Sequence, residues 1–396
     1  MNEKNVLSYE QERFWFLHQM NPDNPANNRP CLIRISGILD EKLLRMALNR
    51  LVYRHSIIRA YFPQKDGVPY QLIHPYCELP IELIDFLSWS EENRQIEIDR
   101  MIQKEIRKPF RIDQDMLIRI KILRTQTEEH LLLITIHHII FDGWSLTCVL
   151  QEVESDYQAL VGGIQEPPKE LSYQYIDYAR EQRDAFASMA MREKLSFWCE
   201  KLSGELPLVE LPLDRPRLKA TTLSDGFVHF MFTVEETMAI KTTARRERAT
   251  LFMVLLTSLK ILLYRYAGQE DIIVGSMVSG RNRAETSELI GLFVNTLALR
   301  TSLSGNITFR EAVRRVKKTA LDGYEHQDVP FAKLVAEINP PRIDSRNPFF
   351  QVMINMHNMP KAENRVSGLL FEDLEVSNGV DQLDLTLKAS EKDGQL

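Results

Sequence analysis

Residues 131–143 read Leu-Leu-Leu-Ile-Thr-Ile-His-His-Ile-Ile-Phe-Asp-Gly, an apolar run followed by two histidines and an aspartate–glycine pair. The apolar part, Leu131 to Ile136, is the pattern of a β-strand that is covered on both faces. Asp142-Gly143 is a natural turn pair. A helix is predicted to follow, with Ser145 as its N-cap residue. The segment therefore predicts a buried strand, a turn and a helix in succession.

Outward from this segment, predicted helices alternate with predicted strands. Apolar residues at helical spacing predict helices that begin near residue 40 and cover about 186–202, 251–266 and 309–325. Strands are expected at 56–62, 271–278, 293–300 and 349–356. This alternation indicates an α/β fold in layers. Because 396 residues exceed the usual size of a single core, we expect two lobes, 1–180 and 181–396.

Composition and charge narrow the class of protein. The formal net charge is −6 and there are no basic blocks, so nothing favours nucleic-acid binding. The longest apolar stretch, Leu251 to Tyr264, is too short to span a bilayer and contains Lys260. The first residues lack the apolar run of a signal peptide. We therefore expect a cytoplasmic protein without membrane or nucleic-acid partners.

The cysteines and histidines show no pattern of metal ligands. The four cysteines are far apart in sequence and form no CxxC pair, so zinc-ligand spacing is absent and a disulfide framework is not expected. Adjacent strand residues point to opposite faces, so His137 and His138 are poorly placed to share one metal ion. One histidine can instead be structural while the other faces a cavity. From these residues alone, a catalytic histidine and a purely structural strand end both remain open.

The segment 137–145 resembles the HHxxxDG signature of condensation domains of nonribosomal peptide synthetases. Six other segments resemble further motifs of that family and follow the family's order: residues 8–17, 54–62, 175–179, 290–296, 326–331 and 342–348. Together these segments cover nearly the whole chain. The resemblance implies an α/β fold with two lobes of chloramphenicol-acetyltransferase type, set in a V with a tunnel between them.

The resemblance also implies a reaction and its partners. A condensation domain forms an amide bond between a donor acyl or peptidyl thioester and the α-amine of an acceptor aminoacyl thioester. Donor and acceptor peptidyl carrier proteins would each insert a phosphopantetheine arm, so the domain itself holds no cofactor. A neighbouring adenylation domain would supply the amino acids. The motifs resemble those of domains with an L-configured donor, and a lipid-initiating starter domain stays an alternative.

The resemblance assigns roles within the signature. The second histidine, His138, is the expected catalytic residue. Gly143 is the second catalytic candidate, because its backbone N–H can approach a developing oxyanion, and a simple turn glycine is the alternative. His137 is expected to be structural. Asp142 is also expected to be structural and to pair with an arginine, for which the candidate is Arg59.

Four further residues are tunnel or substrate candidates, each with a structural alternative. Phe141 is bulky and would narrow the tunnel beside the active histidine. Trp144 is expected to pack rather than to recognise substrate. Ser145 is a helix cap or, less favoured, a catalytic hydroxyl. Asn295 either lines the tunnel or caps buried backbone groups.

Relatives of other function remain alternatives. One is an ester-forming or epimerizing member of the same superfamily. The other is a non-catalytic module that docks carrier proteins, although such modules tend to lose the histidine or the glycine, which this chain retains. Heterocyclization is disfavoured, because those domains replace the paired histidines with aspartates. Family members usually continue into a further strand and a last helix, so the lobe 181–396 is expected to be truncated, with an exposed sheet edge.

Overall fold

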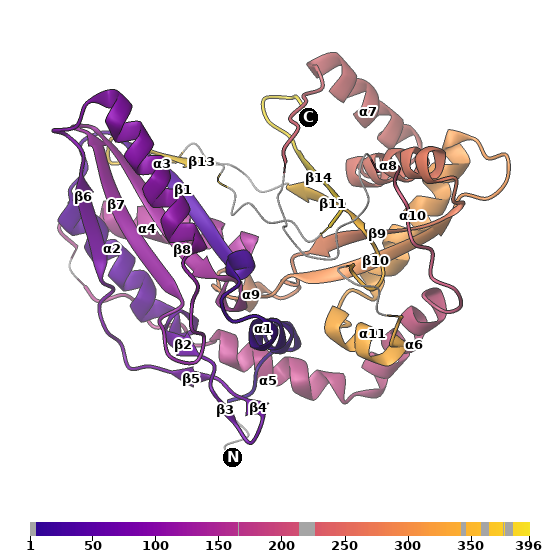
Figure 1. The fold of residues 1–396 in the computed structure, drawn as a ribbon, viewed down its shortest axis with the longest axis horizontal. Coiled ribbons are helices and arrows are strands. Elements are labelled where there is room, and N and C mark those ends of the chain that lie inside the picture. The colour runs from indigo at the N-terminus through magenta and orange to yellow at the C-terminus, as the bar shows by residue number, and fades with distance from the viewer. Residues whose placement is uncertain are drawn as a thin grey trace. The chain divides into compact units, whose positions relative to one another are not determined.

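The computed structural model describes residues 5–164, 166–213, 226–341, 346–357, 364–374, 376 and 383–396. They form two compact units (Figure 1). Unit 1 holds the described residues of 1–185, 281–293 and 359–378, and unit 2 holds those of 186–280, 294–358 and 379–396. The predicted division placed all of 181–396 in one lobe. The structure instead assigns two later segments to unit 1, because they pair with elements far away in the sequence.

Unit 1 is built on a six-stranded sheet in the order β12-β13-β1-β8-β7-β6. Only the pair β6–β7 is parallel, and the other neighbours are antiparallel. The strands are β1 (Asn28–Ser36), β6 (Ile81–Asp85), β7 (Ile118–Gln126), β8 (Glu129–His137), β12 (Asn364–Val366) and β13 (Leu369–Leu374). Every residue of β8 from His130 to His137 is buried, which confirms the strand predicted from the apolar run.

Helices cover both faces of this sheet (Figure 1). The helices of unit 1 are α1 (Tyr9–Met20), α2 (Glu41–Arg54), α3 (Glu91–Arg107), α4 (Gly143–Val161), α5 (Tyr175–Phe186, which ends at the first residue of unit 2) and the short α9 (Ala284–Ser287). Leu131 and Leu133 of β8 join the apolar cluster formed with α3. Ile134 and Ile136 line a small space with side chains of α2 and α4. Because side chains alternate along a strand, β8 is buried on both sides.

The strand predicted over 56–62 is wrong. Residues Ser56–Arg59 form a 3-10 turn, η2, followed by the two-residue strand β2 (Ala60–Tyr61). Both the N–H and the hydroxyl of Ser56 donate to Oε1 of Gln174, at 3.1 and 2.9 Å. These distant hydrogen bonds hold the backbone in a turn although two isoleucines favour a strand.

The remaining short elements lie in unit 1. They are η1 (Pro25–Asn27), β3 (Gln64–Lys65), β4 (Val68–Pro69), β5 (Leu72–Ile73) and η3 (His138–Ile140).

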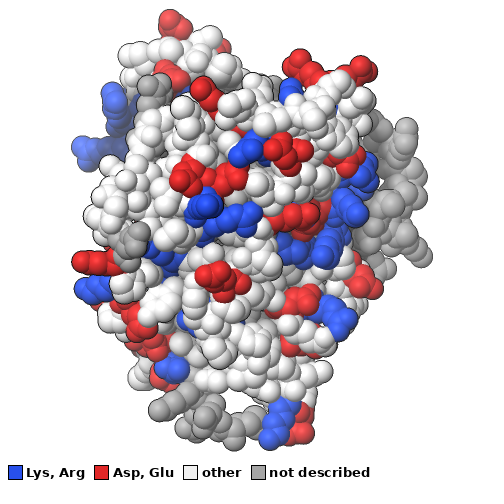
Figure 2. Space-filling model, turned by 90° about the vertical axis from the view of Figure 1, so that its left-hand side faces the viewer, with Lys and Arg blue, Asp and Glu red and all other residues white. Residues whose placement is uncertain are grey.

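On the face in Figure 2, acidic and basic side chains are interspersed rather than segregated. Ion pairs of this mixed kind include Arg124 with Glu41 and Asp85, and Lys121 with Glu82.

Unit 2 has a four-stranded sheet in the order β10-β9-β11-β14. Its strands are β9 (Asp271–Val278), β10 (Asn295–Ser302), β11 (Val352–His357) and β14 (Leu385–Ser390). Its helices are α6 (Met189–Lys201), α7 (Val234–Arg246), α8 (Leu251–Ala267), α10 (Phe309–Glu325) and α11 (Phe331–Ile338). The predicted helices over 251–266 and 309–325 and the strand over 271–278 are confirmed. Both units combine helices with a sheet, as the predicted fold class requires.

Helix α8 carries a fully buried lysine. Lys260 Nζ donates to the backbone oxygens of Ile272 and Leu299, at 3.1 and 2.6 Å, and to Oγ1 of Thr301 at 2.9 Å. Burial lowers the pKa of its ammonium to about 7.

No single helix in the described ranges is long and apolar enough to cross a membrane. The pair α7 and α8 is together long and apolar enough, but the two helices bend by 100° at the break between them.

Candidate active site

The two histidines stand on either side of the end of β8. His137 is the last residue of the strand, and Nδ1 of its ring accepts a hydrogen bond from the N–H of Ile139 at 3.1 Å. Its ring also meets the rings of His18 and Phe110, both edge-on with centroids 6.1 Å away. Burial, with a smaller contribution from His18, lowers the pKa of His137 to about 3. The lone pair of Nδ1 is thus used by the backbone, which is consistent with the structural role predicted for this residue.

His138 has the opposite arrangement. Its Nδ1 lies 2.6 Å from the carbonyl oxygen of Phe141, which can only accept, so Nδ1 carries the proton and Nε2 keeps a lone pair. Nε2 has no hydrogen-bond partner in the part of the chain that the structure describes. Burial first, and the charge of Arg29 second, hold the pKa of His138 well below 6.5. At neutral pH this ring therefore offers a free basic nitrogen.

The buried His137 predicts a loss of stability in acid. Its pKa is about 3 in the folded protein and ~6.5 when unfolded, so between these values only the unfolded chain binds the proton. Stability must then fall as the pH drops through this window, by up to about 1.4 kcal/mol per pH unit. Urea unfolding between pH 4.5 and 7 measures the slope. His137→Asn, which can still accept from Ile139, should have a shallower slope, and equal slopes would contradict the assignment.

Asp142 is the N-cap of α4 and makes four hydrogen bonds. Its Oδ1 accepts from the N–H and the hydroxyl of Ser145 at 2.9 and 2.7 Å, and from Nη2 of Arg281 at 3.0 Å. Its Oδ2 accepts from the N–H of Phe293 at 3.0 Å. The side chains of Asp142 and Arg281 are each 2% exposed, so this is a buried ion pair. The predicted structural aspartate paired with an arginine is present, but with a different arginine.

The predicted pairing of Arg59 with Asp142 is wrong. Arg59 donates to the backbone oxygens of Val52 and His74, at 3.1 and 2.7 Å, because it ends the turn η2 rather than lying on a strand. Arg281 was missed by sequence reasoning. It lies outside the family motifs, 139 residues from Asp142, and no local pattern marks it.

Ser145 is not the N-cap that the sequence predicted, since Asp142 holds that position three residues earlier. Its hydroxyl is fully buried and accepts from the N–H of Gly291 at 3.1 Å and from Arg281 Nη2 at 3.0 Å. The carbonyl of Gly291 and Oδ1 of Asp142 are acceptors for its single proton, at 3.0 and 2.7 Å. A hydroxyl engaged in this way supports a structural role.

Side chains from the end of α2, the start of α4 and the start of α5 hold the backbone of the four residues 290–293. His55 Nδ1 accepts from the N–H of residue 290 at 3.4 Å, and Ser145 bonds to residue 291. Tyr175 donates its hydroxyl to the carbonyl of residue 292 at 2.6 Å, and Asp142 accepts from residue 293. The Tyr175 ring passes so close that a Cβ on residue 291 would lie 2.0 Å from it, so only glycine fits.

Gly143 is the first residue of α4, and its surroundings are open. A Cβ added there would meet no described atom within 4 Å, and its φ is not positive. Neither local packing nor the backbone conformation therefore requires glycine at this position. The N–H groups in the first turn of a helix have no partner within the helix. That of Gly143 has no hydrogen-bond partner elsewhere among the described residues.

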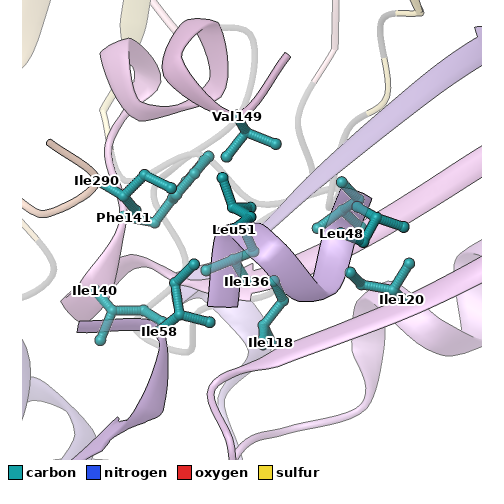
Figure 3. A pocket seen from close by; sticks show the side chains of 11 residues that line it. Leu48, Leu51, Ile58, Ile118, Ile120, Ile136, Ile140, Phe141, Val149 and Ile290 are labelled. Atoms are coloured by element: carbon teal, nitrogen blue, oxygen red, sulfur yellow. The ribbon is translucent and has the colours of Figure 1, made fainter. Parts of the chain in front are cut away.

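Of the two aromatic candidates of the signature, Phe141 is placed by packing, whereas Trp144 is exposed and held by a hydrogen bond. The side chain of Phe141 is buried and faces a cavity of about 10 Å³ in unit 1 (Figure 3). Such a space is no larger than about one water, and its lining is apolar throughout. Trp144 is 38% exposed, and its Nε1 donates to the carbonyl of Ser287 at 2.9 Å.

Asn295, in unit 2, supports the capping interpretation. Its Nδ2 donates to the carbonyls of Gln327 and Val329 at 2.8 and 2.7 Å, and its Oδ1 accepts from the N–H of Phe331 at 3.0 Å. One amide side chain thus satisfies three backbone groups around the start of α11. None of its polar atoms is left over for a ligand in this arrangement.

We expect Asn295→Ala to destabilise unit 2, because buried backbone groups lose their partners. The free energy of unfolding should fall by about 1–3 kcal/mol for the unsatisfied groups. Chemical denaturation followed by tryptophan fluorescence measures the change. Unaltered stability together with slower catalysis would instead assign Asn295 to the substrate tunnel.

No group of three or more histidine, cysteine, aspartate or glutamate side chains is placed to hold a metal ion within the described ranges. The four cysteines, Cys31, Cys77, Cys148 and Cys199, are free thiols. The site therefore consists of one histidine with a free nitrogen and a buried ion pair that holds the helix start and the neighbouring backbone.

Comparison with known proteins gives matches over the whole chain. The family model of the condensation domain matches residues 1–396. Bacitracin synthase 3 of Bacillus licheniformis is 34% identical over 390 residues, which are 98% of this chain and 6% of that protein. Surfactin synthase subunit 1 of Bacillus subtilis is 36% identical over 390 residues, 98% of this chain and 10% of that protein. The chain thus spans only a small part of each relative's length.

Solved structures share the fold. The X-domain from teicoplanin biosynthesis aligns with a TM-score of 0.87 and 23% identity, over 98% of this chain and 85% of that one. The first condensation domain of the CDA synthetase aligns with a TM-score of 0.79 and 19% identity, over 98% and 90%. These alignments confirm the predicted two-lobed α/β fold.

Proposed function

Because the chain belongs to the condensation domains of nonribosomal peptide synthetases, we propose that it forms an amide bond between two carrier-bound groups. The donor is an acyl or peptidyl thioester, with an L-configured last residue, and the acceptor is an aminoacyl thioester. Each is held on the phosphopantetheine arm of a peptidyl carrier protein, and an adenylation domain supplies the amino acids. The two loaded carriers are the substrates of the domain, which itself provides the histidine and the helix start.

One observation carries this proposal: the free Nε2 of His138. The acceptor amine attacks the thioester carbon, the C–N bond forms and the C–S bond breaks. The amine loses one proton, which Nε2 accepts and passes to the departing thiolate, so atoms and charge balance. A neutral ring is needed for this, and burial keeps the pKa of His138 well below 6.5. The Phe141 carbonyl fixes which nitrogen is basic.

Orientation of the two substrates contributes more to the rate of amide-bond formation than proton transfer does. An α-amino group has a pKa of ~8, so part of the acceptor is already neutral at pH 7. Positioning can supply effective molarities of about 10⁵–10⁸ M, whereas a general base contributes roughly 10²–10⁴-fold. We propose that the N–H of Gly143 donates to the oxyanion of the tetrahedral intermediate. Its lack of a partner and the open space around it support this role.

We expect Gly143→Ala to slow transfer by tenfold or more without loss of stability. A methyl group would occupy the space that the substrate needs, while alanine suits a helix better than glycine. Gly162→Ala at the other end of α4, where an added Cβ makes only ordinary contacts, is the matched control and should leave transfer unchanged. Normal turnover by Gly143→Ala would leave Gly143 as a simple turn glycine.

The alternatives differ in what they transfer. An ester-forming relative uses a hydroxyl acceptor, and an epimerizing relative changes the donor without transfer. A docking module transfers nothing; among proteins of this fold, the X-domain from teicoplanin biosynthesis has been solved in complex with OxyB. The free nitrogen of His138 favours the catalytic alternatives.

The test uses two carrier proteins, one loaded with an acylaminoacyl thioester and the other with an aminoacyl or a hydroxyacyl thioester. Intact-mass spectrometry follows the acceptor carrier over time. We expect the donor mass to appear on the aminoacyl carrier and only slowly on the hydroxyacyl carrier. Faster transfer to the hydroxyl would indicate ester formation, and carrier binding without any transfer would indicate a docking module.

A further inference from the structure

A basic groove lies in unit 2 between the end of α7 and the exposed face of α10. It has a volume of about 450 Å³. Five cationic side chains line it against two carboxylates, an excess of three positive charges: Arg246, Arg248, Arg314, Lys317 and Lys318 face Glu247 and Asp322. The whole chain has a net charge of −6, so this local surplus is opposite in sign to the rest.

The carboxylates in and beside the groove compensate only part of its positive charge. Glu247 pairs with Arg310 at 2.9 Å and Asp322 pairs with Lys201 at 3.8 Å, and both of these cations lie outside the lining. Within the groove, Asp322 pairs more closely with Lys318, at 2.8 Å, and Glu247 lies 3.8 Å from Arg246. Arg314 lies 3.9 Å from Glu311, outside the lining, so three of the five cations have a carboxylate partner. Lys317 donates only to a backbone oxygen, that of Arg248, at 2.6 Å. The guanidinium of Arg248 has no ion pair among the described residues, so both cations are available to a ligand.

Arg248 occupies a position where the backbone favours glycine. Its φ is 50°, the left-handed conformation, directly after the C-cap residue of α7. Glycine is the common residue at this point of a helix end, because a Cβ is strained there. Strain retained at one residue points to a use for its side chain. Here that side chain lines the groove.

We propose that this groove binds a ligand with two or more adjacent phosphate groups. Arginine forks bind phosphate oxygens in pairs, and lysines add point charges. The volume lies in the range of about 300–1,000 Å³ that small-molecule sites occupy. Among the described residues that line the groove, Leu321 is the only apolar one, so a hydrophobic ligand is disfavoured. The ligand is free pyrophosphate or a nucleoside polyphosphate, and this inference is independent of amide-bond formation.

Isothermal titration calorimetry of the full chain at constant ionic strength tests the site. Pyrophosphate, ATP, orthophosphate and sulfate are the probes. We expect pyrophosphate or ATP to bind at least tenfold more tightly than orthophosphate or sulfate. Tighter binding of ATP than of pyrophosphate would identify a nucleotide site, and the reverse would identify free pyrophosphate. Equal binding of sulfate and pyrophosphate would overturn the proposal.

Two matched variants separate the groove from the general charge of the protein. Arg248→Gly should weaken pyrophosphate binding tenfold or more with an equal or higher Tm, because glycine relieves the left-handed backbone. Arg245→Gln removes the same charge from an exposed residue outside the lining and should bind normally. Equal weakening by both variants, or none by Arg248→Gly, would contradict the site. So would displacement of pyrophosphate by an equal concentration of a glutamate-rich peptide, which would assign the groove to an acidic protein.

Discussion

His138→Ala should slow amide transfer by roughly 10²–10⁴-fold, the contribution of a positioned general base. The protein should remain folded, because the change removes one hydrogen bond, from Nδ1 to the Phe141 carbonyl and worth about 1 kcal/mol, and one ring contact, with Phe14. Single-turnover transfer between loaded carriers measures the rate, and thermal unfolding measures stability. Transfer within a few-fold of wild type would rule out proton transfer by this residue.

A second variant distinguishes two roles of the ring, proton acceptance by Nε2 and fixation of the turn η3. Asparagine at position 138 can donate to the Phe141 carbonyl as Nδ1 does, but it has no basic nitrogen. If Nε2 accepts the proton, His138→Asn should be as slow as His138→Ala. If the ring only fixes the turn η3, His138→Asn should recover most of the rate. His137→Asn is the control, since the lone pair of His137 is already used by Ile139.

Asp142→Ala should destabilise unit 1 by about 3–5 kcal/mol, the usual cost of leaving one partner of a buried ion pair uncompensated. Arg281 would remain 2% exposed without its carboxylate, and the N–H groups of Ser145 and Phe293 would lose their acceptor. Urea unfolding of the soluble fraction measures the loss. A normal unfolding curve with lost transfer would instead make Asp142 a participant in the chemistry.

The double variant Asp142→Leu with Arg281→Met is the matched test of the ion pair. Replacing both partners by apolar side chains leaves no buried charge, and such replacements are often neutral. The double variant should therefore be more stable than Asp142→Ala, although the hydrogen bonds to Ser145 and Phe293 are still lost. If the losses in unfolding free energy of the single variants Asp142→Leu and Arg281→Met sum to that of the double variant, Asp142 and Arg281 are not coupled.

Local patterns explain which elements were predictable. The strand β8 and the helices α8 and α10 have continuous or helically spaced apolar residues, so their own sequence determines their burial. The 3-10 turn at 56–59 was not predictable in this way, because Gln174, more than a hundred residues later, binds Ser56. The N-cap of α4 was misassigned because Asp142 and Ser145 are both capping residues, and the glycine between them obscured the helix start.

The candidate site was predictable in part for the same reason. His138, Asp142 and Gly143 are adjacent in sequence, so a motif can mark them. Arg281 and the backbone of residues 290–293 reach the site only through the fold of unit 1, and no local pattern could pair Arg281 with Asp142. The tautomers of the two histidines also depend on tertiary structure. They follow from which backbone group each Nδ1 meets, Ile139 N–H or the Phe141 carbonyl.

The most direct measurement identifies the product on the acceptor arm after one turnover by the wild-type protein, and so shows which chemical bond has formed. The acceptor thioester is cleaved from its carrier, and tandem mass spectrometry identifies the released product. We expect an amino acid that carries the donor group on its α-nitrogen, and much less of it with His138→Ala. Release of the unmodified amino acid, from folded protein with both carriers loaded, would contradict amide-bond formation at His138.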